Sequence, residues 1–392
     1  MRKIYILLLI AILSSCIDKE AKKLHSVIIG YELPDGVEDI SLDGQEVYIR
    51  NTTSNRTYVS NFNSGICEFE LETGLYSIST SFFSDKTGNL NATINEINIS
   101  DILDNSVVLE MGYVYSSPII IEEIYYSGAK SPLNKNYIPD QFVKLYNNSS
   151  TSQSLRGLCL ATIVGSSNSP SKWIDEKGNL LSYLPINQTA WRFPDNNCKL
   201  VLEPGESIVV AQDAINHSDP SISTSKVDLS NADFETFARE SGKDYDNLGV
   251  ENMELIWSKS DRIPDWMLTP FGPPVVLFRL PENYKDYVGN IDNIKSQPGS
   301  FVKYFCIPKT FVLDAVECVR SAERNHKRLH NELDAGYVYV SQPFKGYSVR
   351  RIIQRTDGDR VVYMDTNNSS ADFITDQQPS PIKQLSNNNR EY

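Results

Sequence analysis

Short alternations of apolar and polar residues, each ending in turn residues, are the feature that most restricts the fold of this chain. The stretch "DQFVKLYNNSS" places Phe142, Lys144 and Tyr146 on one face of an extended chain, with apolar residues on the other. The Asn and Ser residues that follow favour a turn, because Asn hydrogen-bonds its own backbone and tolerates left-handed geometry. We therefore interpret the stretch as a strand that enters a turn, and not as a reactive or metal-binding site.

The same pattern fills the region from Val27 to about Leu109. The segments "QEVYIRNTT", "YVSNFNSGICEFEL" and "ETGLYSISTSFF" are separated by turn residues, and the last places Tyr76, Ile78 and Thr80 on one face. The 21 Tyr and 15 Phe of the chain, beside many Thr and Val, favour β-structure because these side chains fit a pleated surface. We expect a mainly β protein that begins with a small β-sandwich.

A second group of strands begins near Pro118. "PIIIEEIYYSG" is the first strand, the stretch described above is the second, and "SLRGLCLATIV" and "CKLVLEPGESIVVAQDA" supply more, with a turn at Pro204–Gly205. Both faces of these strands are largely apolar, as in a sandwiched sheet. If the first two strands are neighbours, we expect Lys144 to pair with Glu123.

Residues from about 217 to 298 show a different pattern. "DLSNADFETFARE" predicts one short helix, with Ser230 as N-cap and Asp233 in the first turn. The remainder is too rich in Pro and Gly for long helices, so we expect an insertion that packs on the sandwich. Trp257 and Trp266 anchor it by core packing or, alternatively, line a ligand groove.

Two family resemblances follow from these segments. The first region resembles prealbumin-like or carboxypeptidase-regulatory-like modules. The second resembles the lamin-tail type of β-sandwich, which is immunoglobulin-like and has a Ser-x-x-Arg strand near its end. The first resemblance rests on Val47, Ile49, Asn51, Thr53, Gly65, Phe69, Gly74, Tyr76 and Ile78. The second rests on Ile121, Glu123, Ile124, Tyr146, Asn147, Leu155, Gly157, Leu202, Pro204, Gly205 and on 346–351 and 371–381.

The run from "NKNYIPDQFVKLYNNSS" to "DGDRVVYMDTNNSSADF" is also similar to an uncharacterised family of Bacteroidota outer-membrane lipoproteins. This resemblance implies a structure and a surface setting, but no biochemical activity. We expect a signal peptide at 1–15, a lipidated tether at 16–26, a prealbumin-like sandwich at 27–112, and a lamin-tail-like sandwich at 113–392 with its insertion at about 217–298.

The N-terminus "MRKIYILLLIAILSSC" combines two cations, an apolar run and small residues before Cys16. The run is short for a membrane span and follows a basic start, which is typical of a secretory signal. Its ending resembles the bacterial lipobox, which implies cleavage before Cys16 and acylation of Cys16, and Ile17 to Glu20 resemble an acidic surface-sorting signal. We expect a lipid anchor at Cys16 that faces the cell exterior. The alternative is a soluble secreted protein in which Cys16 is incidental.

Five further cysteines are present, at 67, 159, 198, 306 and 318. Their compartment permits disulfides, but their number is odd and their spacing matches no zinc motif. Either one or two bridges form, or these cysteines serve as small buried hydrophobic residues.

The segment "AERNHKRLHNELD" is the strongest candidate for metal chemistry, because His326 and His330 are four residues apart. Two His without a defined third ligand do not make a zinc site, and the neighbouring cations oppose a divalent ion. We expect a solvated loop. "DGDR" at 357–360 lacks the remainder of a calcium loop and predicts a β-turn.

Two functions remain open. We favour a non-enzymatic binding or accessory module that partners an outer-membrane transporter or binds an extracellular glycan or protein. The alternative is a glycan-active hydrolase with unidentified carboxylates and with Trp257 and Trp266 as a sugar platform. We expect no catalytic residue, cofactor or metal, because no nucleophile-elbow, Walker or zincin motif is present. The net charge of −13 opposes nucleic-acid binding.

Overall fold

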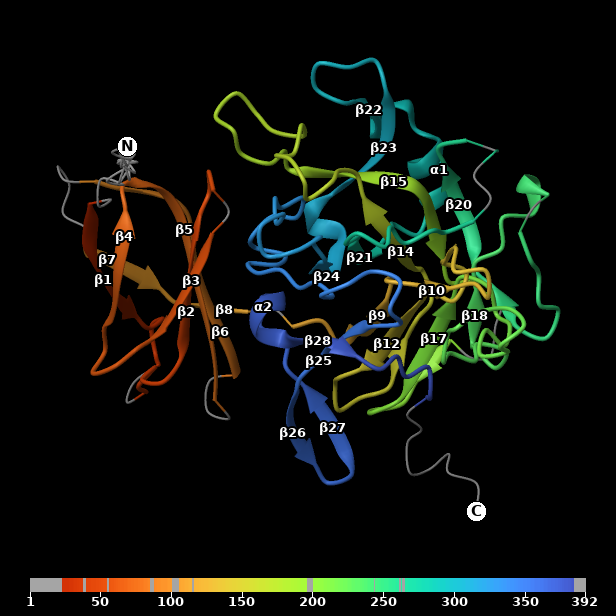
Figure 1. The fold of residues 1–392 in the computed structure, drawn as a ribbon, viewed down its shortest axis with the longest axis horizontal. Coiled ribbons are helices and arrows are strands. Elements are labelled where there is room, and N and C mark those ends of the chain that lie inside the picture. Colours follow the sequence, from red (N-terminus) through yellow and green to blue (C-terminus); the bar gives the residue numbers. More distant parts are fainter. Residues whose placement is uncertain are drawn as a thin grey trace, which may run out of the picture.

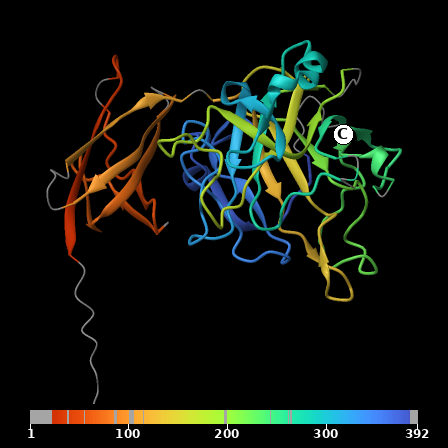
Figure 2. The same ribbon diagram turned by 90° about the horizontal axis from the view of Figure 1, so that it is seen from above.

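The computed structural model describes residues 23–383, apart from 38–39, 55, 85–87, 101–105, 115, 196–199, 243, 261 and 263–264. Its strands form two groups that lie side by side, a smaller group at the N-terminal end and a larger group in the rest of the chain (Figure 1, Figure 2). The described residues contain only two short α-helices, α1 (Tyr284–Gly289) and α2 (Ser369–Asp372). The predicted mainly β class is confirmed. No helix in these residues is long and apolar enough to cross a membrane.

The first group is a sandwich of a three-stranded and a five-stranded sheet. Val27, Ile29, Val47 and Ile49 are buried between the sheets because alternate residues of each strand face inward. Tyr76, Ile78 and Thr80, predicted to share a face, are all buried. The strands, in sheet order, are β4 (Cys67–Glu72), β1 (Leu24–Glu32) and β7 (Ser106–Glu110), then β3 (Thr57–Asn61), β2 (Glu46–Asn51), β5 (Gly74–Ser84), β6 (Gly88–Ile99) and β8 (Gly112–Tyr113).

The second group contains two seven-stranded sheets whose facing apolar residues, among them Leu145 and Leu277, form one core. The first of these sheets has the order β19 (Glu251–Asn252), β18 (Phe234–Glu235), β17 (Ser207–Ala211), β12 (Phe142–Asn147), β9 (Ile119–Tyr125), β25 (Ser348–Arg351), β28 (Phe373–Gln377). The other has the order β22 (Ile294–Ser296), β23 (Lys303–Pro308), β15 (Tyr183–Arg192), β14 (Leu158–Ile163), β21 (Pro274–Arg279), β24 (Val312–Glu317), with β20 (Glu254–Ser258) paired to β15.

Three short ribbons complete the second group. They are β10 (Ala129–Lys130) with β11 (Asn136–Tyr137), β13 (Gln153–Ser154) with β16 (Val201–Leu202), and β26 (Ile353–Asp357) with β27 (Arg360–Tyr363). The last ribbon turns at residues 357–360, where a β-turn was predicted.

The stretch at 140–150 forms β12, as predicted, and every residue of this strand is buried. The strand ends at Asn147, whose side chain makes hydrogen bonds to backbone groups of the turn that follows. Its Nδ2 donates to the carbonyl oxygens of Thr151 and Leu202, both at 2.8 Å, and its Oδ1 accepts the Ser149 N–H at 3.1 Å. These bonds satisfy the backbone of the turn, which is why a polar side chain is buried there.

β9 and β12 are antiparallel neighbours, but the predicted ion pair of Lys144 with Glu123 is wrong. Lys144 bonds instead to Glu122, with 3.0 Å between Nζ and Oε1. The register moves from Lys144 opposite Glu123 to Leu145 opposite Ile121, so Glu122 is an extra residue in a β-bulge. A bulge turns two successive side chains toward the same face, and Glu122 therefore reaches Lys144.

Residues 217–298 supply strands to both sheets as well as loops and α1, and β21 lies between β14 and β24. The short helix predicted within 228–240 is wrong: Phe234 and Glu235 form β18, parallel to β17, and only the 3₁₀ turn η1 (Arg239–Ser241) follows. Phe234 is fully buried against Phe193 at 5.0 Å between ring centres, so packing overrides the local capping signal.

Both tryptophans of this region pack on hydrophobic cores, Trp266 fully buried and Trp257 half-buried. Trp266 is buried in the core between the sheets, and Trp257 lies on Phe305 with 5.8 Å between their ring centres. Core packing of both residues, which was preferred over a ligand groove, is what the structure has.

Polar bonds join the two strand groups. Asn91 Nδ2 donates to the Thr366 carbonyl oxygen at 3.1 Å and Asn89 Nδ2 to the Asp365 carbonyl oxygen at 2.5 Å. Arg50 donates to the Asn325 carbonyl oxygen at 3.1 Å. The contact thus consists in part of side chains from β2 and β6 that bind the backbone of the second group.

The cysteines at 67, 159, 306 and 318 are free and buried. Burial raises the pKa of the Cys159 and Cys306 thiols to about 12, so these residues behave as small hydrophobic side chains. Cys198 and the expected lipid-attachment residue Cys16 lie outside the described residues.

Candidate functional site

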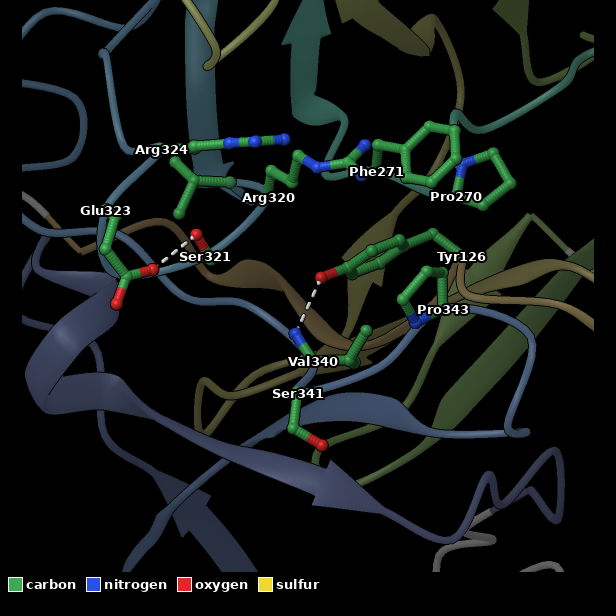
Figure 3. Close-up of a pocket in the computed structure, with 11 residues that line it drawn as sticks. Tyr126, Pro270, Phe271, Arg320, Ser321, Glu323, Arg324, Val340, Ser341 and Pro343 are labelled. Atoms are coloured by element: carbon green, nitrogen blue, oxygen red, sulfur yellow. Dashed lines mark hydrogen bonds between the residues drawn. The ribbon is translucent and has the colours of Figure 1, made fainter.

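A cavity of about 420 Å³ lies at one end of the larger strand group (Figure 3). We call it the arginine pocket. The residues that define it are Tyr126, Phe271, Arg320, Glu323, Arg324 and Pro343. They come from four places in the sequence: the end of β9, the loop before β21, the segment after β24, and the loop that precedes β25.

Gly272 permits the close approach that forms one wall of the pocket. Its φ is +95°, and a Cβ atom there would lie 2.3 Å from the carbonyl carbon of Val319. Only a glycine allows the loop at 270–272 to touch the segment at 319–320. This contact places the ring of Phe271 beside Arg320.

Two guanidinium groups extend across the pocket in the same direction (Figure 3). That of Arg320 lies over the Phe271 ring, 4.3 Å from the ring centre, a cation–π contact that holds the side chain extended. Arg324 is exposed. Neither guanidinium has an ion-pair partner within the part of the chain that the structure describes.

Buried arginines of the same strand group are paired. Arg328 is buried and bonds to Glu317 at 2.7 Å, and Arg351 makes two bonds to Asp314, at 2.8 and 2.9 Å. These buried guanidinium groups are thus neutralised by a carboxylate. The two pocket arginines present their charge to whatever enters the pocket.

The pocket has little acid–base capacity. Glu323 is the carboxylate that lines it, and a hydrogen bond from the Ser321 hydroxyl, at 2.8 Å, lowers the pKa of Glu323. Tyr126 accepts the Val340 N–H at 3.0 Å, and burial raises the pKa of its phenol well above the ordinary value. Glycoside hydrolysis requires two carboxyl groups that flank the bond, and one of them must be protonated. The arginine pocket suits binding better than this chemistry.

His326 and His330 line a second cavity, of about 300 Å³, between the two strand groups. His330 Nε2 lies 2.7 Å from the Leu181 carbonyl oxygen, and burial lowers the pKa of both His residues. The segment is a loop, as predicted, but it is only partly solvated: its start at Glu323 and Arg324 is exposed, whereas Asn325 and Arg328 are buried. The Arg328 guanidinium donates to the carbonyl oxygens of Gly165, Gly272 and Cys318. These bonds fix the segment that carries His326 and His330 against neighbouring loops.

The sequence contained one signal for the arginine pocket. The cations at 324–328 are unfavourable for a metal, and the same density of positive charge favours an anion. The sequence does not show which of these arginines has a carboxylate partner. Arg328 is buried against Glu317, whereas Arg320 and Arg324 line the pocket.

Comparison with known proteins gives two matches. Residues 203–380 match the family model described as "Protein of unknown function (DUF4876)". The chain is also similar to the crystal structure of a DUF4876 family protein from Bacteroides thetaiotaomicron, with 26% sequence identity and a TM-score of 0.59. That match covers 91% of this chain and 96% of the other. No curated protein matches the sequence.

These matches support a DUF4876 domain of unknown function within residues 203–380 and a structural similarity of the chain to a Bacteroides protein. The lamin-tail resemblance and the lipid anchor stay predictions.

Proposed function

We propose that the protein is a surface-exposed outer-membrane lipoprotein that binds an anionic ligand in the arginine pocket and catalyses no reaction itself. The observation that carries this proposal is the pair of guanidinium groups, Arg320 and Arg324, that lie across the pocket without an ion-pair partner among the described residues. The lipobox at Cys16 supports the setting.

A carboxylate is the ligand group that fits this arrangement. Guanidinium groups bind carboxylates through two parallel N–H···O bonds, and these charge-assisted bonds are stronger than neutral ones. The chain as a whole carries a net charge of −13, so the two arginines form a local positive site on a negative protein. Anions should therefore bind selectively at this pocket, because the net negative charge of the protein repels them elsewhere on the surface.

We favour an acidic glycan over a transporter partner as the occupant. A uronic acid offers a carboxylate for the arginines and an apolar ring face for the side chains of Phe271 and Pro343. The cavity of about 420 Å³ accommodates one or two sugar rings, whereas a protein partner needs a broader contact.

Binding is tested by titrating the mature chain with an oligogalacturonate and with a neutral oligosaccharide of equal length. We expect the acidic sugar alone to bind, and Arg324→Ala to weaken the affinity by about tenfold, which corresponds to about 1.4 kcal/mol. Arg156→Ala, at an exposed arginine outside the pocket, is the matched control and should bind as the wild type does. Equal binding of both sugars, or an unchanged affinity in Arg324→Ala, would contradict the proposal.

The hydrolase alternative is decided in the same samples. Incubation with the acidic glycan should release no new reducing ends. Turnover that survives repurification and is lost in Glu323→Gln would replace the binding proposal with an enzymatic one.

The anchor has its own test. Cells that express the full chain should incorporate labelled palmitate into the protein, and Cys16→Ala should abolish the label and release the protein from the membrane fraction. Label that persists in Cys16→Ala would exclude the lipobox. Protease added to intact cells should degrade the anchored protein if it faces the exterior.

A further inference from the structure

Three aspartates meet at the β17–β19 edge of the larger strand group, and none of them lines the arginine pocket. Asp213 follows β17, Asp244 follows η1, and Asp265 lies in the loop between β20 and β21. One carboxylate oxygen from each lies within 4.8 Å of the others. Three segments that are distant in the sequence thus bring three negative charges together, and we call them the aspartate cluster.

A buried amide belongs to this cluster and has an oxygen without a partner. Gln212 is 4% exposed, and its Nε2 donates to Asp265 Oδ2. Its Oε1 is buried and accepts no hydrogen bond from the described residues. A buried amide oxygen without a donor costs about 1–3 kcal/mol, so a bound water or cation beside it would stabilise the fold.

Two of the carboxylates also have a buried oxygen without a donor. Asp213 Oδ1 and Asp244 Oδ1 are buried and have no hydrogen-bond donor in the described part of the chain. The other oxygen of Asp244 accepts the Ala238 N–H at 2.6 Å, and Asp265 Oδ1 accepts the Thr236 hydroxyl at 3.3 Å and the Trp266 N–H. Protein donors therefore orient the carboxylates of Asp244 and Asp265, as outer-shell groups do around metal ligands, while Asp213 and Asp244 each keep one buried oxygen without a donor among the described residues.

No described cation balances this charge. Salt bridges within the described residues do not include any member of the aspartate cluster. Burial, followed by repulsion among the acids, raises the pKa of Asp213 to about 7 and that of Asp265 to about 8. Burial also raises the pKa of Asp244 to about 6. A cation bound among the three carboxylates would supply the positive charge that the described side chains do not.

We propose that the aspartate cluster and the Gln212 amide oxygen form a calcium site. Calcium binds carboxylate and amide oxygens at about 2.3–2.6 Å, so two ligand atoms on opposite sides of the ion lie roughly 5 Å apart. The carboxylate spacing fits that limit. Magnesium requires shorter bonds and keeps several of its waters, which suits a largely protein-made site less well.

The ion links the segment after β17 to the loops that carry Asp244 and Asp265. β18 and β19 are two-residue strands at this edge of the sheet, with few backbone bonds of their own. A bound calcium ion would remove the repulsion among the three carboxylates. It would also cross-link the three segments at the β19 edge of the sheet. This proposal is independent of ligand binding in the arginine pocket.

Calcium binding is measured by calorimetric titration of the mature chain after treatment with a chelator. We expect one equivalent of calcium to bind, with a dissociation constant in the range of extracellular modules, about 10⁻⁴–10⁻³ M, and magnesium to bind more weakly. Asp213→Asn should weaken calcium binding roughly tenfold to a hundredfold. Asp219→Asn, at an exposed acid six residues away, is the matched control and should leave it unchanged.

A second measurement uses terbium as a luminescent substitute for calcium. Trp266 is adjacent in sequence to Asp265 and donates its backbone N–H to that carboxylate, so excitation of tryptophan should sensitise bound terbium. Calcium should compete the signal away. Asp244→Asn serves as the second ligand variant in case Asp213→Asn fails to fold.

Two results would overturn the proposal. One is a wild-type chain that binds no calcium and shows no thermal shift at several times 10⁻³ M calcium, which would leave a protonated acid cluster as the explanation. The other is calcium binding that persists unchanged in a folded Asp213→Asn or Asp244→Asn variant, which would place the ion elsewhere.

Discussion

Glu122 and Lys144 make a buried ion pair within the β9 bulge, with exposures of 1% and 2%. Tyr363 donates a second hydrogen bond to the same carboxylate oxygen, at 3.0 Å. Burial raises the pKa of Glu122 although the charge of Lys144 opposes this shift. The pair therefore offsets a large desolvation cost, and each partner depends on the other.

Lys144→Met should destabilise the protein by about 3–5 kcal/mol, because it leaves the Glu122 charge buried and unpaired. Urea unfolding at pH 7 measures this loss. Lys172→Met, at an exposed lysine, should leave stability unchanged, and adding Glu122→Gln to Lys144→Met should recover part of the loss. Equal stability of Lys144→Met and wild type would show that Glu122 is already protonated at pH 7.

At the scale of elements, the aspartate cluster makes the stability of the β17 edge depend on pH. In the absence of metal, folding raises the pKa of Asp213 to about 7 and that of Asp265 to about 8, from an ordinary value of 3.8. Groups whose pKa rises on folding stabilise the protein below the unfolded pKa, and this contribution is lost as the pH rises through the folded pKa. Charged or titratable neighbours include Glu235, whose pKa is raised to about 7, and His217, which contacts the Asp213 carbonyl oxygen.

We therefore expect the free energy of unfolding in EDTA to fall between about pH 5 and pH 8, and calcium to restore much of it at pH 8. Urea unfolding at both pH values, with EDTA or with calcium, measures this. Asp213→Asn should show a smaller fall in EDTA and a smaller gain from calcium. A metal-free protein that is equally stable at pH 5 and pH 8 would contradict the expected protonation.

Elements whose pattern is local were predictable, and elements fixed by distant residues were not. β12 followed from six residues that alternate before an Asn-rich turn. The helix expected within 228–240 does not form because β17, more than twenty residues earlier, pairs with Phe234 and Glu235. Lys144 was assigned to Glu123 because a bulge leaves no mark in an alternating sequence.

In the two proposed binding sites, too, some residues could be found from a local sequence pattern and others could not. "DYDNLG" at 244–249 follows the start of a calcium loop except for Leu248, so part of the aspartate cluster was visible in the sequence. Asp213 and Asp265 were not, because only the sheet brings them to Asp244. Likewise, Phe271 and Arg320 meet in the arginine pocket only through the folded loops.

At the scale of the whole molecule, polar bonds decide whether the two strand groups unfold together. Asn89 and Asn91 of β6 donate to the backbone of the segment that carries Asp365, whose carboxylate bonds to Arg351 at 3.1 Å. The first strand group is thus tied to a buried ion pair of the second. Each such bond contributes about 0.5–1.5 kcal/mol, so losing both should uncouple the first group from the second.

The four tryptophans of the chain all lie between residues 173 and 266, and their fluorescence therefore reports on the second group alone. Circular dichroism reports on both groups. In the wild type we expect the two signals to change at the same urea concentration, whereas in Asn89→Ala/Asn91→Ala the dichroism should begin to change earlier while the fluorescence midpoint stays in place. Asn98→Ala, on the exposed side of the same strand, controls for lost strand propensity and should behave as the wild type does. Coincident transitions in the double variant would mean that apolar contacts, rather than these amide bonds, couple the two groups.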